Sequence, residues 1–116
     1  MATWVLLRGL GREAGHWHDV PARLADATGD RVLTPDLPGV GRAADRRPPW
    51  TIAAIARDVA ERVAAELAAA RAAGGTEATR ATGDAVGPLR VLGHSLGGMV
   101  ALRWAALAAA GADADA

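Results

Sequence analysis

The stretch VLGHSLGGMVAL, residues 91–102, constrains the fold of this chain more than any other. Ser95 is the only serine among the 116 residues, and glycines stand two places before and after it, at Gly93 and Gly97. An apolar, β-rich run precedes the motif and an alanine-rich run follows it. A G-x-S-x-G sequence in that setting predicts a sharp turn from a strand into a helix, because larger residues would be crowded at the two flanking positions.

Such a turn suits nucleophilic chemistry. A serine hydroxyl reacts poorly at neutral pH unless a base takes its proton and hydrogen-bond donors receive the developing oxyanion. The turn lifts the hydroxyl above the sheet and aims the first amides of the helix at the reacting carbonyl. We therefore predict strained backbone geometry at Ser95, between a strand ending near Leu92 or Gly93 and a helix beginning at Leu96 or Gly97.

The remaining sequence predicts alternating strands and helices. Apolar, β-rich runs at 3–7, 31–38 and 89–93 favour strands. Trp17, Val20 and Leu24 fall at helical spacing, which predicts a helix there if Pro21 lies in its first turn. A second helix, capped by Thr51, is the best defined. Its apolar stripe consists of Ile52, Ile55, Val59, Val63 and Leu67. The order β-α-β-α-β-α predicts one α/β domain over 1–116, with a three-stranded parallel sheet flanked by helices and a flexible loop at about 72–88.

Composition excludes several classes of function. Thirteen arginines balance thirteen acidic residues without a basic face, so we expect no nucleic-acid partner. The absence of cysteine excludes disulfides and cysteine-ligated metals. The amino-terminal apolar run is too short for a signal peptide, and the apolar stretch from Leu96 is interrupted by Arg103 and is short for a bilayer. We expect no membrane partner and a cytoplasmic location.

Three other polar features have structural explanations. His16 and His18 have the H-x-H spacing of some metal sites, but the further ligands of such patterns are absent, so we expect no metal and take both as residues at a helix start. Asp36 ends the second predicted strand, and a loop-anchoring role beside two prolines is favoured over a catalytic one. His94 is interpreted as a packing or hydrogen-bonding neighbour of the serine.

Taken in order, these segments resemble the amino-terminal half of the α/β-hydrolase superfamily, from residue 4 to about 110. The resemblance rests on LLRGLG, GHWHDVPARL, VLTPDLPGVGRA and VLGHSLGGMVALRWA. It implies that Ser95 is the nucleophile and that the backbone amides of Leu10 and Leu96 form the oxyanion hole. It also implies a cofactor-free attack on a small ester, thioester or related acyl substrate. The departures are Arg8, where many members have histidine, and Val40 and Ala43 in PGVGRA.

The triad implied by the resemblance runs in the order serine, acid, histidine. No histidine follows Ser95, and the only later acids, Asp113 and Asp115, come too early for the acid of the family. No triad acid or base is therefore identified, and we expect the chain to be a fragment that is inactive by itself. The strand order of the family places 3–7 in the centre and leaves 89–93 at an open edge, which favours self-association.

Three further functions share these residues. An acyltransferase or a cofactor-free peroxidase would use the same turn as a hydrolase. A non-catalytic binding or interaction module could retain the turn after losing its base. The sequence does not identify the acyl substrate.

Overall fold

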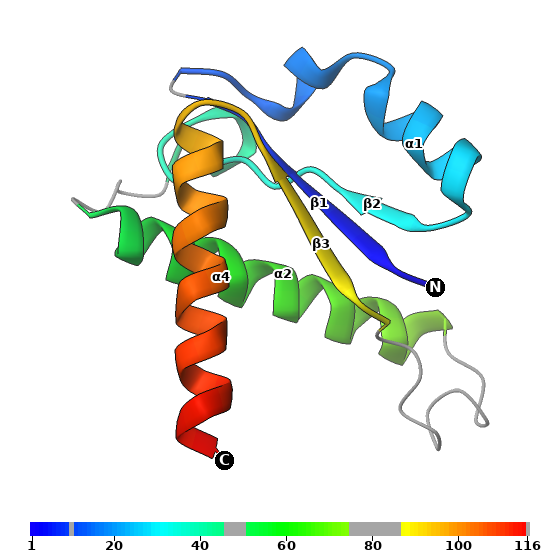
Figure 1. Cartoon of the computed structure of the whole chain (residues 1–116). Helices are drawn as coiled ribbons and strands as arrows, with labels where there is room; N and C mark the ends of the chain where they lie inside the picture. Colours follow the sequence, from blue (N-terminus) through cyan, green and yellow to red (C-terminus); the bar gives the residue numbers. More distant parts are fainter. Residues whose placement is uncertain (10, 46–50, 75–86, 116) are drawn as a thin grey trace.

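The fold is built on three parallel strands. A computed structural model describes residues 1–9, 11–45, 51–74 and 87–115. The central strand β1 (Thr3–Leu7) pairs with β2 (Arg31–Leu33) on one side and with β3 (Leu89–Gly93) on the other, in the order β2-β1-β3 (Figure 1). Thr3 lies opposite Arg31 in one pair and opposite Leu89 in the other. The predicted fold class and strand order are confirmed.

Helices cover the sheet. On one face lie α2 (Ile52–Gly74) and α4 (Leu96–Asp115), which cross each other, and α1 (Val20–Thr28) lies beside β2 (Figure 1). Two short 3-10 helices, η1 (Ala14–Trp17) and η2 (Gly41–Ala43), lie in the loops that follow β1 and β2. Pro21 stands in the first turn of α1, as expected. Among the described residues, none of the helices is long and apolar enough to cross a membrane.

The core lies between the sheet and the pair α2 and α4. Strand side chains alternate between faces, so Val5 and Leu7 enter this core while Leu6, also fully buried, points to the other face. The apolar stripe of α2 is confirmed, since Val59 and Val63 are buried in the same cluster. The hydroxyl of Thr51 accepts a hydrogen bond from the amide of Ala54 at 3.0 Å, so the predicted cap of α2 is present as well.

Two predicted boundaries were wrong. The second strand ends at Leu33 and does not continue to residue 38. The chain reaches Pro35 two residues later, and proline has no N–H to donate to a sheet ladder. The helix α2 extends through Gly74, so the predicted loop does not begin at 72. Alanine is the best helix former, and the run at 68–73 consists of alanines and one arginine. The rest of that loop, 75–86, lies outside the described residues.

Asp30 ties the start of β1 to the turn between α1 and β2. Its carboxylate accepts hydrogen bonds from the amide of Ala2 at 2.9 Å and from the indole N–H of Trp4 at 3.1 Å. The backbone hydrogen bond from Ala2, assisted by Trp4 and Thr28, lowers the pKa of Asp30 below its ordinary value. The charged form of this carboxylate therefore contributes to the pairing of the first two strands.

Candidate active site

Ser95 occupies the turn between β3 and α4. The strand ends at Gly93 and the helix begins at Leu96, both within the predicted limits. The φ angle of Ser95 is 58°, in the left-handed region, where the only other described non-glycine residue is His18. Side chains other than glycine are disfavoured in this region by contact between Cβ and the following carbonyl. The predicted strained turn is confirmed, and the Ser95 side chain is exposed at its apex.

The glycines of the motif are required by close backbone packing. A methyl group added at Gly93 would collide with the carbonyl oxygen of Gly97. One added at Gly97 would collide with the carbonyl oxygen of Leu7 and would lie 2.6 Å from that of Arg8. The first turn of α4 therefore lies directly on the carboxyl end of β1, and this contact sets the direction in which Ser95 projects.

One of the two predicted oxyanion donors can be assessed. The amides of Gly98 and Met99 donate to the carbonyl of Ser95 at 2.9 and 3.2 Å, whereas the amide of Leu96 donates no hydrogen bond to any described residue. A free amide next to the serine is what an oxyanion hole requires.

Leu10, the other predicted donor, lies outside the described residues. Its neighbour Gly9 is close to the turn, since a methyl group added there would lie 3.1 Å from Cβ and 3.6 Å from Oγ of Ser95. The amide of Arg12 donates to the carbonyl of Gly9 at 3.1 Å, which closes the loop that contains Leu10. The loop that follows β1 thus approaches the serine, while the convergence of the two amides stays a prediction.

The three histidines do not supply an evident base. Nδ1 of His16 accepts a hydrogen bond from the amide of Glu13 at 2.9 Å, so the proton of the neutral ring resides on Nε2. A triad histidine has the opposite arrangement, with Nδ1–H donating and Nε2 free to take the proton of the serine. His18 and His94 are exposed, and no hydrogen bond between described residues joins a histidine to Ser95.

The family is shown by comparison with known proteins. A model of the Alpha/beta hydrolase family matches residues 4–116. The chain belongs to this family. No curated protein and no solved structure matches it.

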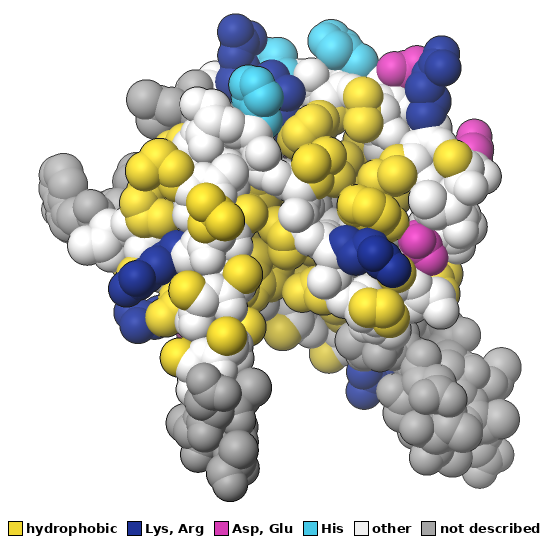
Figure 2. All heavy atoms as spheres, viewed as in Figure 1, with side chains coloured by type: hydrophobic (Ala, Val, Ile, Leu, Met, Phe, Trp, Pro, Cys, Tyr) yellow, Lys and Arg dark blue, Asp and Glu magenta, His cyan; other side chains and the backbone are white. Residues whose placement is uncertain are grey.

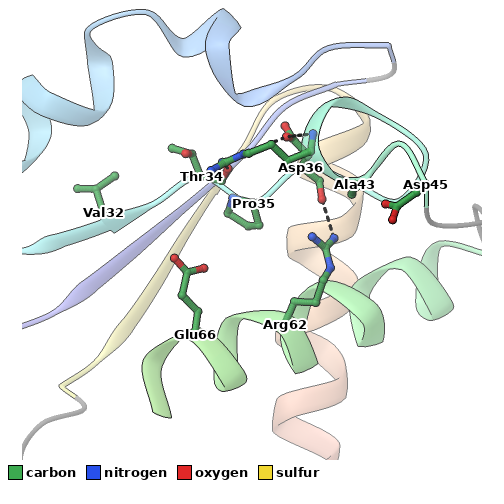
Figure 3. A pocket seen from close by; sticks show the side chains of 9 residues that line it. Val32, Thr34, Pro35, Asp36, Ala43, Asp45, Arg62 and Glu66 are labelled. Carbon is green, nitrogen blue, oxygen red and sulfur yellow. Dashed lines mark hydrogen bonds and ion pairs between the residues drawn. The ribbon is translucent and has the colours of Figure 1, made fainter. Parts of the chain in front are cut away.

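In this α/β-hydrolase chain, Asp36 anchors loops. Its carboxylate is almost completely buried and accepts hydrogen bonds from the amides of Ala14 at 2.6 Å and Arg42 at 2.9 Å. The guanidinium of Arg62 donates to the backbone carbonyl of Asp36 at 2.6 Å (Figure 3). These bonds fasten the loop after β1 and the loop after β2 to helix α2. The expected anchoring role is confirmed.

Asp36 also lines a pocket of about 610 Å³. Figure 3 shows the side chains around this pocket. It is lined by residues from β2, the loop that follows it, η2 and α2, including Val32, Arg42 and Glu66, and none of its lining residues belongs to the turn at Ser95. The later acids, Asp113 and Asp115, fall in the last turn of α4, at the end of that helix opposite the serine (Figure 1). A helix of this length spans about 30 Å, so neither of these two acids is positioned as a triad member.

Sequence reasoning missed one polar contact close to the turn. The guanidinium carbon of Arg8 lies 4.8 Å from the centre of the ring of Trp17, which is a cation–π contact. The only signal in the sequence was the arginine at the end of the first strand, where many members of the family have histidine.

Proposed function

We propose that the chain carries the nucleophile half of a serine hydrolase that acts on an ester, thioester or similar acyl substrate. Ser95 is the proposed nucleophile, and the amides of Leu96 and Leu10 are the proposed oxyanion donors. The observation that carries the proposal is the left-handed backbone of the only serine, at a strand-to-helix turn in a chain of this family. Strain of this kind is maintained at functional sites more often than elsewhere.

The chemistry follows from the atoms present. Oγ of Ser95 attacks the acyl carbon and transfers its proton to a base, while the negative charge moves to the carbonyl oxygen and is met by backbone amides. Collapse of the tetrahedral intermediate breaks the bond to the leaving group, which takes a proton, and leaves an acyl-serine that water then hydrolyses. An acyltransferase would differ only in the acceptor of the acyl group.

The proposal includes low activity for these 116 residues alone. No histidine follows Ser95, and the tautomer of His16 is not that of a general base. An oxyanion hole with binding alone retains about 10³–10⁴ over the reaction in water. The second candidate is a non-catalytic binding module, and it is favoured by the absence of a described histidine hydrogen-bonded to Ser95.

A chemical-rescue assay tests both functions. The chain is incubated with a short-chain activated ester with and without free imidazole, alongside Ser95→Ala and a His16→Ala/His18→Ala double variant, and acylation of Ser95 is followed by mass spectrometry. We expect little turnover without imidazole and acylation of Ser95 when imidazole serves as the base.

The outcomes separate the alternatives. Equal rates for the wild type and Ser95→Ala in imidazole, with no acyl-serine, would contradict the hydrolase and support the binding module. Robust turnover without imidazole that is lost in Ser95→Ala would overturn the predicted inactivity. A further loss in the double variant would then identify a substitute base.

A further inference from the structure

Arg8 holds a positive charge at a fixed position beside the turn. The residue follows β1 directly, and its backbone carbonyl is packed against Gly97. The next residue, Gly9, lies against Ser95. Because the guanidinium also stacks on Trp17, both ends of the Arg8 side chain are held. The backbone of Arg8 therefore lies at the turn that carries Ser95, and its guanidinium lies over Trp17 in the loop that follows β1.

This charge is uncompensated within the described part of the chain. Three other arginines have carboxylate partners: Arg23 with Asp19, Arg42 with Asp36 and Arg62 with Asp58. Arg8 forms no ion pair with a described residue, and its Nε is shielded from solvent without a described hydrogen-bond acceptor. Nε1 of Trp17, in the stacked ring, also lacks an acceptor. No described carboxylate therefore neutralises the guanidinium, and an anion that reaches its unshielded nitrogens would supply the missing partner.

The surroundings favour an anion. Figure 2 shows arginine and histidine side chains along the left and centre of the upper edge of the molecule, where the carboxyl ends of the strands lie in Figure 1, and acidic side chains at the right end of that edge. Asp36, the only buried acid among the described residues, already binds two amides and Arg42. The carboxylate of Glu13 lies 4.0 Å from the Cβ position of Gly15 and makes no ion pair with Arg8.

We propose that Arg8 binds a carboxylate carried by the acyl substrate, which makes the substrate a half-ester or half-thioester of a dicarboxylic acid. The inference rests on the proposed function, since it names the substrate class of the same site. The ends of the guanidinium that are not shielded form a planar fork that matches the two oxygens of a carboxylate. The ring of Trp17 keeps the fork in place, so little side-chain entropy is lost on binding.

Side-chain NMR of the full chain tests the inference by binding alone. Monomethyl succinate, its neutral counterpart dimethyl succinate, and inorganic phosphate are titrated separately while the Nε–H signal of Arg8 and the indole N–H signal of Trp17 are followed. We expect saturable shifts of both signals with monomethyl succinate and none with dimethyl succinate. Tighter binding of phosphate than of the half-ester would overturn the assignment to a carboxylate.

Two arginine variants test whether Arg8, and not another arginine of the same loop, binds the carboxylate. Arg8→Gln should weaken binding of monomethyl succinate by at least about tenfold, the loss of a charged hydrogen bond. Arg12→Gln removes the same charge from an exposed position in the same loop and should bind like the wild type. Equal weakening by both changes would show a diffuse charge effect and overturn the role of Arg8. If Arg8→Gln does not fold, the comparison of charged and neutral ester in the wild type still decides.

Ser95→Ala separates this inference from the proposed function. Retained binding of monomethyl succinate in Ser95→Ala, together with failure of acylation in the rescue assay, would refute the nucleophile and leave the anion site standing. Acylation of Ser95 by neutral and half-ester substrates at equal rates, with no shift of the Arg8 signal, would refute the anion site and leave the hydrolase standing.

Discussion

Ser95 holds a backbone conformation that glycine would adopt at lower cost. A left-handed residue other than glycine costs roughly 1–2 kcal/mol, and here the cost is offset by the packing of the first turn of α4 on the end of β1. The hydroxyl is thereby exposed above the sheet, while the amide of Leu96 donates to none of the described residues. At the residue scale, glycine is required at positions 93 and 97, where backbone segments are in contact. Serine occupies position 95, whose side chain projects from the turn.

Alanine substitutions at the adjacent Gly97 and Gly98 distinguish a collision with neighbouring backbone atoms from the effect of higher helix propensity. Gly97→Ala should lower the free energy of unfolding by about 1–3 kcal/mol, because the new methyl group would meet carbonyl oxygens of Leu7 and Arg8. Gly98→Ala is the control, since the nearest atom would be 3.4 Å away. That change should be neutral or raise the stability by up to about 1 kcal/mol. Urea denaturation measures both, and equal effects would contradict the proposed contact.

The limits of a strand could be predicted from the sequence where the apolar run is followed directly by residues that end it. The first and third strands have the predicted limits, because apolar β-rich runs end there at Arg8 and at the turn after Gly93. The predicted second strand was too long. The apolar run continues beyond Leu33, but Pro35 has no N–H to donate and interrupts the hydrogen-bond ladder of the sheet. The stack of Arg8 on Trp17 could not be predicted, since it depends on how a loop folds back over the sheet.

The hydrogen bonds from Ala2 and Trp4 to the carboxylate of Asp30 make the pairing of β1 with β2 sensitive to low pH. Hydrogen bonds to the charged carboxylate lower its pKa in the folded state, so its contribution to stability is fully present above the unfolded pKa of 3.8. That contribution is lost as the pH falls through the lower folded value. The stability difference between the wild type and Asp30→Asn should therefore be largest near neutral pH and should shrink below about pH 4.

Chemical denaturation at a series of pH values measures this difference. Asp26→Asn is a matched control, because Asp26 is exposed on α1 and its carboxylate makes no hydrogen bond to a described residue. It should leave the free energy of unfolding at neutral pH unchanged. A difference between the wild type and Asp30→Asn that stays constant with pH would show that the carboxylate charge is not involved.

The whole molecule exposes apolar surface beside an unpaired strand edge. In the described sheet β3 has a neighbour only in β1, and Leu92 on that strand is 45% exposed. On the adjoining helix Met99 and Leu102 are 56% and 76% exposed, and an apolar groove of about 360 Å³ separates helix and strand. Figure 2 shows hydrophobic side chains along α4 on this side of the molecule. Such an edge is a template for pairing with another strand.

We expect self-association through β3 in solution. The sedimentation coefficient should rise with concentration for the wild type and should fall toward that of a monomer in Leu92→Lys, because a charge on an edge strand opposes pairing. Val20→Lys is a control that changes an equally exposed apolar residue on α1. A wild type that stays monomeric over the concentration range, or equal effects of the two substitutions, would contradict a role for this edge.

The central position of β1 delays completion of the sheet during synthesis. β1 is made first, yet one of its two partners, β3, begins only at Leu89. At about 5–20 residues per second, a ribosome needs roughly 4 to 16 s to pass from the end of β1 to the start of β3. Throughout that interval the most buried strand of the protein presents an open edge to the cell, so yield on expression should depend on translation speed and on chaperones that hold unpaired strands.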